Sequence, residues 1–485
     1  MSLESRILSL DQPTIKLDQM STRDTETGAT GVVDISENKR RKKGDLYPFV
    51  MINKHTLTAD ELTHFAISET DFLPSLEFSM LMSNGIFLSN HYPKDGDIVS
   101  VYIRSKRKKI KPIRMDFDIL SIVSSPSPQS HGDSNVFMFV CVLRVPGLYS
   151  EYCKAFKDKT SFETVRTVAK ELKLGFATNM TSTSDKMTWV CPFISYMQFI
   201  TDTTRHAYTS EDSFIAAFVD KYYHLNFVNI RQQLNDDKDV EKSIEVHSAR
   251  LDHMRGDEDM QEDESLNLVL GNHTSLQKTS LFIEGYTLRS SAGQVMLENG
   301  YRKSAQFYDV HLSGPFKNRY QSHVVEAPAS PDGYTSNKGR GSEDISSKLS
   351  TFKWLGTQSS NTIGNSHKNY KYSAVLNWQN QRELDKMHLE VVLSQCGFNL
   401  RRGMRIPVVI VNDGDPHRVS STKSNGEEPE MKITLDRFLS GFYIVLAMKT
   451  IFYPQDGVFR QIVQLGRRDW PTPVNYDKTT DLTES

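Results

Sequence analysis

The sequence has little cysteine and no pattern suited to binding a metal. Its 485 residues include only four cysteines, Cys141, Cys153, Cys191 and Cys396. These are too few and too scattered for a disulfide framework, and none forms a CxxC pair, so we expect reduced, mostly buried thiols. The 14 histidines contain no HExxH pattern, and His247 and His253 lie in an acidic stretch where solvated side chains are expected. We therefore predict no metal site and no cofactor.

Phosphate-binding and hydrolase motifs are also missing. No GxxxxGKS/T or GxGxxG loop occurs in the chain, so nucleotide use is not expected. There is no GxSxG elbow, and Cys191, although near His206, lacks the signature of a thiol nucleophile. The 60 Asp and Glu residues single out no carboxylate pair of the kind that a glycosidase uses. We predict no catalytic residue.

Neither sign of charge is in excess, and long hydrophobic runs are missing. Lys and Arg number 58 against 60 Asp and Glu, a net charge of -2, so no global field favours nucleic acid or an anionic membrane. The apolar stretch 442–452 contains Lys449 and is shorter than the roughly 20 residues that cross a bilayer. The N-terminal MSLESRILSLDQ lacks the apolar core of a signal peptide. We expect no membrane span, with synthesis and assembly in a reducing cytoplasm.

Positive charge is concentrated in two short runs. Residues 39–43 read KRRKK and are expected to be part of a solvated tail, with contact to phosphate or an acidic partner as the alternative. Residues 104–111 read RSKRKKIK and lie between two predicted strands, where lysines deter edge pairing. No aromatic residue is interleaved in this second run, as nucleic-acid binding would favour. Contact with an acidic neighbouring subunit is its functional alternative.

Strand patterns dominate residues 46–150, which follow a polar arm, residues 1–45, that we predict to be flexible. Short runs rich in β-branched and aromatic residues are separated by turn residues, including SLEFSMLM, DIVSVYI, MDFDILSIV and VFMFVCVLRV. Such runs are typical of antiparallel strands. We therefore predict a compact antiparallel β domain over this range.

The periodicity becomes helical after Thr160. The segment SFETVRTVAKELKLG spaces its apolar residues as on a helix, with Ser161 as N-cap and Gly175 as the stop. Further helices are predicted over 194–208 and 213–222, the last passing into an extended LNFVNI. Residues 151–232 are accordingly interpreted as a small helical or α+β module.

The rest of the chain alternates polar stretches with β patterns. We predict an acidic linker or loop over 233–264, strands and a long polar loop over 265–370, a β region over 371–471, and a C-terminal tail over 472–485. The polar loop is placed at 327–366, one helix is predicted near 374–387, and the Arg-Gly-Asp at 255–257 is interpreted as chance. Tryptophans are enriched at interfaces but singly belong more often to cores; they are Trp189, Trp354, Trp378 and Trp470.

A repeat relates the early and late β regions. Leu76-Glu77-Phe78 aligns with Leu389-Glu390-Val391, Lys94-Asp95-Gly96 with Arg401-Arg402-Gly403, and Val101-Tyr102-Ile103 with Val408-Val409-Ile410. By strand character alone, residues 118–122 align with 443–447 and residues 136–140 with 458–462. We infer two related β domains; the alternative is that any two antiparallel β domains share this order of strands and glycine turns.

Three segments together resemble baseplate hub proteins of contractile-tailed bacteriophages, the late-control-type hub family. They are LPSLEFSMLMSNGIFLSNHYPKDGDIVSVYIRSK, the helix SFETVRTVAKELKLGFATN with KMTWVCP, and NLRRGMRIPVVIVNDG with SGFYIVLAMKTIFYPQDGVFRQIVQLGRRDW. The resemblance covers about residues 47–230 and 370–471. It implies an α+β, mainly β chain with two related antiparallel β-barrel domains of the tail-tube type, the second completed by residues 371–471. The small module lies between them.

The resemblance also implies a function. It is that of a structural virion protein at the tail baseplate, a homotrimer forming a pseudo-sixfold ring that joins a hexameric tail tube to a trimeric central spike. DNA would pass through the ring without sequence-specific binding, and tape-measure and baseplate wedge proteins are further partners. No site residue is carried over. A tube-end or wedge protein is the first alternative, and a tail-associated cell-wall hydrolase is the second.

Overall fold

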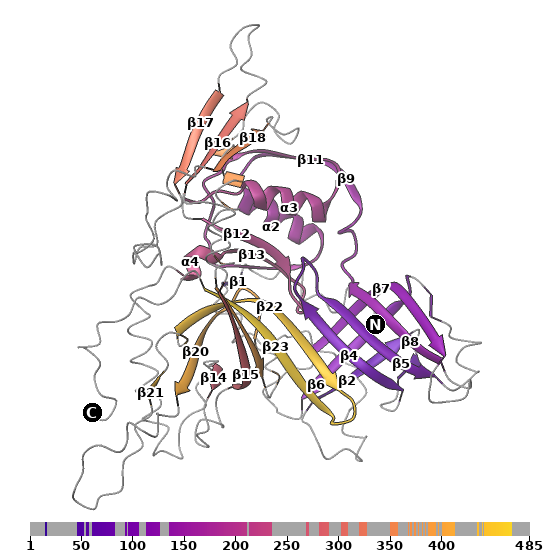
Figure 1. The fold of residues 1–485 in the computed structure, drawn as a ribbon. Coiled ribbons are helices and arrows are strands. Elements are labelled where there is room, and N and C mark those ends of the chain that lie inside the picture. The colour runs from indigo at the N-terminus through magenta and orange to yellow at the C-terminus, as the bar shows by residue number, and fades with distance from the viewer. Residues whose placement is uncertain are drawn as a thin grey trace, which may run out of the picture.

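The structure is a computed structural model, and it is mainly β with few helices. It describes residues 15–16, 46–52, 55–57, 61–82, 93–94, 96–105, 113–126, 135–210, 213–234, 268–270, 281–290, 302–308, 320–326, 350–356, 367, 369–370, 373–374, 377, 381, 384, 387–393, 396, 400–412, 434–435, 439 and 441–467. Figure 1 shows two groups of strands side by side, with a helix-containing module above them.

The first group, here called the first sheet, matches the predicted early β region. Its strands are β2 (Leu46–Ile52), β3 (His55–Thr56), β4 (Leu62–Glu69), β5 (Ser75–Met82), β6 (Ile98–Ser105), β7 (Ile113–Pro126) and β8 (Asn135–Leu143). They pair in the order β3-β2-β6-β7-β8-β5-β4, each neighbour antiparallel. Alternation along β8 places Phe137, Phe139 and Cys141 in the core and leaves Met138 and Val140 exposed.

The second group, here called the second sheet, is assembled from late segments of the chain. Its strands are β14 (Leu268–Leu270), β15 (Leu281–Ser290), β19 (Met387–Leu393), β20 (Arg405–Asn412), β21 (Thr434–Leu435), β22 (Gly441–Tyr453) and β23 (Val458–Arg467). They pair in the order β21-β20-β14-β15-β19-β23-β22, and β22 also pairs with β20. Every strand of this sheet except β21 therefore has at least two partners within it.

Two glycine turns show that the sheets repeat each other. The N–H of Gly96 donates to the C=O of Ile119, and the N–H of Gly403 donates to the C=O of Val445, at 3.3 and 2.8 Å. Both glycines have positive φ, +85° and +77°, a conformation that glycine adopts without steric cost. The two turns therefore meet corresponding points of β7 and β22.

Irregularities in the ladders repeat as well. One bulge skips Leu120 of β7 and its counterpart skips Leu446 of β22. A second bulge skips Thr63 of β4, and its counterpart skips Glu284 of β15. Because bulges fix register locally, four strand pairs of each sheet are related residue by residue.

Part of the predicted alignment is confirmed and part is wrong. Leu76 lies opposite Cys141 and Leu389 opposite Leu465, so the alignment of β5 with β19 is correct. The alignment of 118–122 with 443–447 is off by one residue, because Ile119 corresponds to Val445. The alignment of 136–140 with 458–462 is off by two, since Cys141 corresponds to Leu465. Strand character alone contains no feature that anchors register.

The repeat ends at the sixth strand. β2 runs antiparallel to β6, whereas β14 runs parallel to β20. β14 is also parallel to its other neighbour, β15. The sixth strand of the second sheet, β14, therefore runs in the opposite direction to its counterpart β2 in the first sheet.

The module lies between the two sheets in the sequence. It comprises β9 (Glu151–Lys159), α2 (Ser161–Glu171), β10 (Gly175–Thr178), β11 (Met187–Ser195), α3 (Tyr196–His206), β12 (Ile215–Val219), β13 (His224–Asn229) and α4 (Ile230–Leu234). β9 pairs with β11, while β10, β13 and β12 form one sheet that β1 (Ile15–Lys16) joins at its edge. Helix α3 confirms the prediction over 194–208.

Helix α2 is confirmed, but its ends differ from the prediction. Thr160 is the N-cap: its hydroxyl accepts from the N–H of Glu163, whose carboxylate accepts from the N–H of Thr160. Ser161 instead lies buried and donates its hydroxyl to Asp185. The helix also ends before Gly175, which opens β10.

The helix predicted over 213–222 is wrong. Residues of this segment form β12, which pairs antiparallel with the following β13 through a tight turn. The segment LNFVNI is extended, as expected, and it needs a hydrogen-bonded partner because it is buried along its whole length. Pairing with that strand overrides the helical spacing of Ile215, Phe218 and Val219.

Segments between the module and β19 form a separate sheet and a helical stretch. β16 (Arg302–Tyr308), β17 (Tyr320–Glu326) and β18 (Ser350–Gly356) form a separate sheet. β18 lies inside the stretch 327–366 that was predicted as a polar loop, so that prediction is wrong for this strand. The described residues of the predicted helix near 374–387 are helical up to β19, namely Ala374, Asn377, Gln381 and Leu384.

Several predictions fall outside the described residues. They concern the basic run 39–43, His247, His253, the Arg-Gly-Asp at 255–257 and the tail 472–485. Residues 106–111 of the second basic run also lie outside them, although the run does lie between two strands, β6 and β7, which pair with each other.

Candidate assembly interface

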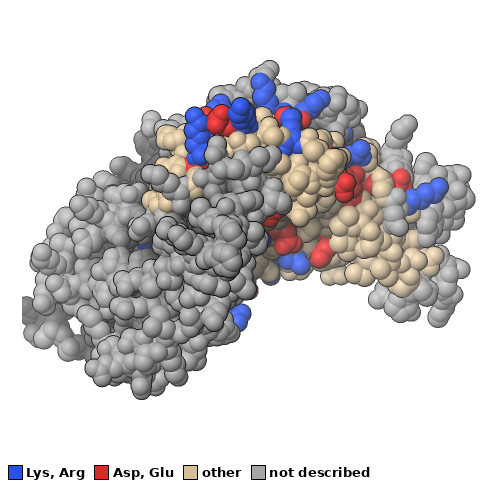
Figure 2. All heavy atoms as spheres, turned by 90° about the horizontal axis from the view of Figure 1, so that it is seen from above, with Lys and Arg blue, Asp and Glu red and all other residues tan. Residues whose placement is uncertain are grey.

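Charged side chains of the described residues do not separate by sign on the face in Figure 2. Lys and Arg lie interspersed with Asp and Glu over the upper part of that face. No group of three or more His, Cys, Asp or Glu side chains among the described residues could hold a metal ion. No described helix is long and apolar enough to span a membrane. The features of the described residues that can carry a function are therefore the places where sheets meet or end.

The two sheets are joined edge to edge. β4 of the first sheet pairs antiparallel with the second half of β22, with Ser68 opposite Lys449 and Phe65 opposite Phe452. Phe65 is fully buried there and lies edge-on to Phe459, with ring centroids 6.2 Å apart. The result is one continuous 14-stranded sheet.

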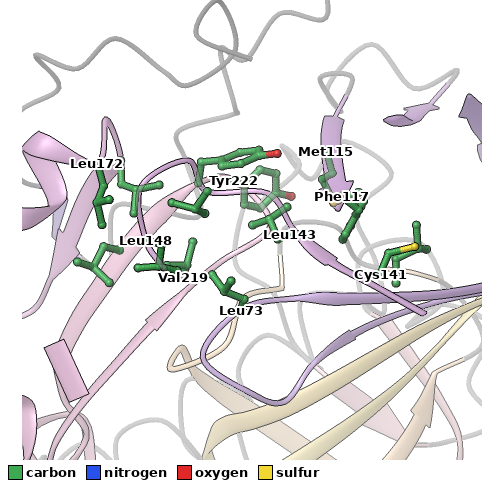
Figure 3. Packing of buried hydrophobic residues seen from close by; sticks show 14 of the residues in the cluster. Leu73, Met115, Phe117, Cys141, Leu143, Leu148, Leu172, Val219 and Tyr222 are labelled. Carbon is green, nitrogen blue, oxygen red and sulfur yellow. The ribbon is translucent and has the colours of Figure 1, made fainter. Parts of the chain in front are cut away.

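An apolar core joins the module to the first sheet. The labelled residues in Figure 3 form a row from Leu172 of the module, past Val219 and Leu73, to Phe117 and Cys141 of the first sheet. These residues belong to a single buried cluster, while most buried residues of the second sheet form another. Phe452 and Phe459 of the second sheet belong to the first cluster, and Ile444 packs with residues of the module. The module and the first sheet therefore share one core.

A turn of the module inserts between the two sheets. Residues 220–223 connect β12 to β13, and the Lys221 amine donates to the Glu69 carboxylate of β4 at 3.0 Å. The same amine donates to the C=O of Leu400, next to the second sheet, at 3.1 Å. Burial alone would lower the pKa of Lys221, but the Glu69 charge raises it, so the amine is charged.

A second buried ion group lies beside this contact. The Asp220 carboxylate is 3.7 Å from the Arg401 guanidinium and 3.4 Å from Nδ1 of His224. Burial alone would raise the pKa of Asp220, but His224 and Arg401 hold it well below its ordinary value. Arg401 also stacks on the Tyr222 ring, 4.2 Å from its centroid. Charges from the module and from the second sheet thus neutralise each other inside the protein.

Arg402 completes the junction. Its guanidinium donates to the C=O of Leu446 in β22 at 2.8 Å and to the C=O of Asp71 beyond β4, and it lies 4.7 Å over the Phe218 ring. From the sequence alone, Arg401 and Arg402 before Gly403 indicate only a repeat and a family resemblance. Their difference from the Lys94-Asp95 of the first turn is the signal that could have indicated a junction.

Among the described residues, the second half of β7 and most of β15 each have a strand partner on one side alone. β7 pairs with β6 only through Asp118, so its second half has β8 on one side alone. β15 has β19 on one side, while β14 covers only residues 281–282 on the other. Leu120 and Val123 of β7 are 60 and 59 % exposed, and Tyr286 of β15 is 41 % exposed.

Residues weighed as chemical candidates in the sequence do not converge. Burial raises the pKa of the Cys191 thiol, which donates to the C=O of Ile194 at 3.4 Å. His206 stacks on Tyr370 instead, with ring centroids 4.1 Å apart. A raised pKa disfavours the reactive thiolate. Trp189 is buried and donates to a backbone C=O, which fits the interpretation as a core residue.

Comparisons with known proteins give structural similarities at low sequence identity. No protein-family model matches the sequence, and the search of curated proteins found no match. The fold is similar to the 43 kDa tail protein of prophage MuSo2 from Shewanella oneidensis, with 9 % identity, a TM-score of 0.49, and coverage of 87 % of this chain and 98 % of that one. A tail protein of Neisseria meningitidis MC58 gives 10 % identity and a TM-score of 0.46, with 88 and 98 % covered.

A third similar structure comes from a secretion system. The E. coli c3393 protein is described as a type VI secretion component similar to T4 bacteriophage tail proteins gp27 and gp5. It gives 9 % identity, a TM-score of 0.39, and coverage of 87 % of this chain and 80 % of that one.

Proposed function

We propose that this protein is a structural baseplate hub of a contractile tail, without catalytic activity. Three copies would form a ring that joins a hexameric tail tube to a trimeric central spike. The observation that carries the proposal is the in-register repeat of the two sheets, together with their edge-to-edge pairing through β4 and β22. The sequence resemblance supports the same role.

The repeat suits a part that adapts between two symmetries. Three chains with two similar sheets each present six similar units around an axis, while the ring itself keeps threefold symmetry. A sixfold tube can then stack on one side and a threefold spike on the other. A chain with a single such sheet would match only one of these symmetries.

We infer that each sheet closes into a barrel of the tail-tube type. In the second sheet, β14 pairs with both β15 and β20, so the six principal strands form a cycle of pairings. Closing a sheet removes exposed edges, which a long-lived assembly needs. The proposal places the protein in the virion tail, with DNA passing through the ring.

Copurification tests the proposed role. The chain is coexpressed with the tail tube protein and, separately, with the spike protein of the same particle, and each complex is isolated through a tag on the partner. We expect both partners to retain the chain, with three copies per spike trimer. Retention by neither partner would overturn the proposal, and a complex with six copies per ring would favour a tube-end protein.

A further inference from the structure

We propose that β15 of one copy pairs antiparallel with the second half of β7 of a second copy, with Arg289 opposite Val123. The partner is thus another molecule of this chain, and the contact repeats the internal β4–β22 pairing between molecules. This inference rests on the proposed function, which supplies the ring, and it adds the two edges and their register.

The strands that flank the internal junction have counterparts at the two edges. β15 takes the place in the second sheet that β4 takes in the first, because Ile67 lies opposite Leu76, and Leu288 lies opposite Leu389. β7 takes the place in the first sheet that β22 takes in the second, with matching bulges against β8 and β23. The internal junction pairs β4 with β22, so its counterpart pairs β15 with β7.

Among the described residues, β7 and β15 each have a stretch with a strand partner on one side alone. The edge of β22 that binds β4 begins where β20 ends, since β20 pairs with residues 441–444 and β4 with residues 448–452. β6 likewise pairs with β7 only up to Asp118, and no described strand pairs with residues 119–126 on that side. On β15, no described strand pairs with residues 283–290 on the side away from β19. Among the residues that the structure describes, both edges are therefore unpaired where the repeat requires them.

Corresponding positions of the two sheets differ in exposure. Phe65 of β4 is fully buried at the internal junction, whereas its counterpart Tyr286 is 41 % exposed. Lys449 of β22 is partly buried where β4 pairs with it, whereas its counterpart Val123 is 59 % exposed. Apolar side chains thus lie exposed in the single chain at positions that the internal junction covers, as expected of a contact that forms between copies.

The register follows from the internal pairing. Ser68 lies opposite Lys449, and Ile67 lies opposite Thr450. Arg289 corresponds to Ser68 and Val123 to Lys449, so these two lie opposite each other across the proposed contact. Leu288 would likewise lie opposite Ser124. Each copy has one β15 edge and one β7 edge, so the contact is head-to-tail, and the threefold ring of the proposed hub closes it after three copies.

Engineered disulfides test both the edges and the register. In a Cys153→Ser background, which removes an exposed thiol, the full chain carries Val123→Cys and Arg289→Cys and is oxidised at concentrations that favour assembly. A matched control carries Ser68→Cys and Lys449→Cys, the corresponding pair inside one chain. An off-register control carries Ser121→Cys with Arg289→Cys, displaced along β7 by two residues, about 7 Å, beyond disulfide reach.

We expect the Val123–Arg289 pair to give covalent dimers and trimers on a non-reducing gel and nothing larger. The Ser68–Lys449 pair should close within one chain, which also shows that the engineered protein folds. The off-register pair should not cross-link into trimers. Each result is checked against the mass of the same sample in solution.

Two outcomes would overturn the proposal differently. Trimers in solution that fail to cross-link through Val123 and Arg289, or that cross-link through the off-register pair, contradict the edges and register but leave the proposed hub role intact. A protein that stays monomeric at every concentration, with its internal control disulfide formed, contradicts the contact and the trimeric hub together.

Discussion

The first and second sheets share their register but differ in what surrounds them. The glycine turns at Gly96 and Gly403 and the bulges at Leu120 and Leu446 correspond, yet the buried residues of the first sheet share one cluster with the module, while most of those in the second sheet form a separate cluster. Phe65 is buried where its counterpart Tyr286 is exposed. Backbone pairing is therefore common to both sheets, and the side chains at their edges specialise each for its neighbours.

The largest expected difference in stability is between breaking the buried Lys221–Glu69 ion pair at the junction and breaking the more exposed Lys449–Glu77 pair. Lys221→Met leaves the Glu69 carboxylate buried without its amine, and we expect a loss of about 3–5 kcal/mol in the free energy of unfolding. The control Lys449→Met removes an exposed partner of Glu77 and should cost at most about 1 kcal/mol. Urea unfolding measures both.

The double variant Glu69→Leu with Lys221→Met sharpens this test. Since it removes both charges, it should recover much of the loss. A Lys221→Met protein as stable as the parent would show that the module turn does not hold the sheets together.

Acid should act first where the module contacts the helical segment before β19. Burial lowers the pKa of His206 to about 4, and Nδ1 of this ring lies 3.2 Å from the C=O of Tyr370. The unfolded chain binds a proton near pH 6.5 and the folded chain only near pH 4, so stability is full above pH 6.5 and falls as the pH drops towards 4. The loss is about 3 kcal/mol at most.

Unfolding measured from pH 7.5 to 4 checks this expectation. His206→Gln should flatten the decline without abolishing it, because burial also lowers the pKa of His367. An unchanged slope in the variant would show that His206 does not contribute. Hydrogen exchange should report opening around α3 before opening in the first sheet.

The two bulge leucines give the next comparison. Leu446 packs partly buried against a cluster that includes Val228 and Leu384, whereas Leu120 is 60 % exposed. We expect Leu446→Ala to cost about 2 kcal/mol and Leu120→Ala to stay within about 0.5 kcal/mol, measured on dissociated chains. Equal costs would mean that the two bulges have similar surroundings.

The glycine turns give the smallest expected difference. Alanine is strained at both positive φ values, but a Cβ at Gly403 would also lie 3.1 Å from Phe218, whereas one at Gly96 meets nothing within 4 Å. Gly403→Ala should therefore destabilise the protein more than Gly96→Ala, by about 1 kcal/mol. Thermal unfolding of the two variants measures the difference, and the reverse order would contradict the described packing.

Much of the fold could be predicted from local patterns. The alternation in VFMFVCVLRV and the two glycine turns sufficed for the strands and for part of the repeat. The helix predicted over 213–222 failed because the buried strand β13 needs a partner, a tertiary requirement that spacing does not reveal. Register failed where the sequence has no glycine to anchor it, because the bulges at Leu120 and Leu446 are visible only in the structure.

The candidate interface could be predicted only in part. Lys221, Asp220 and Glu69 look like ordinary surface charges in the sequence, and only the fold buries them together. Arg401 and Arg402 are part of a repeated pattern in the sequence, but the pattern does not indicate what they contact. The exposure of Tyr286 indicates an interface only by comparison with its buried counterpart Phe65, which requires the structure.

The central claim is a threefold ring built from two repeated sheets per chain. The most direct measurement is the mass of the purified assembly by light scattering, with negative-stain images of the same sample. We predict three chains of 55.3 kDa, about 166 kDa, in a ring with a central channel and six peripheral lobes. A sixfold assembly, or a monomer that turns over peptidoglycan, would contradict the account.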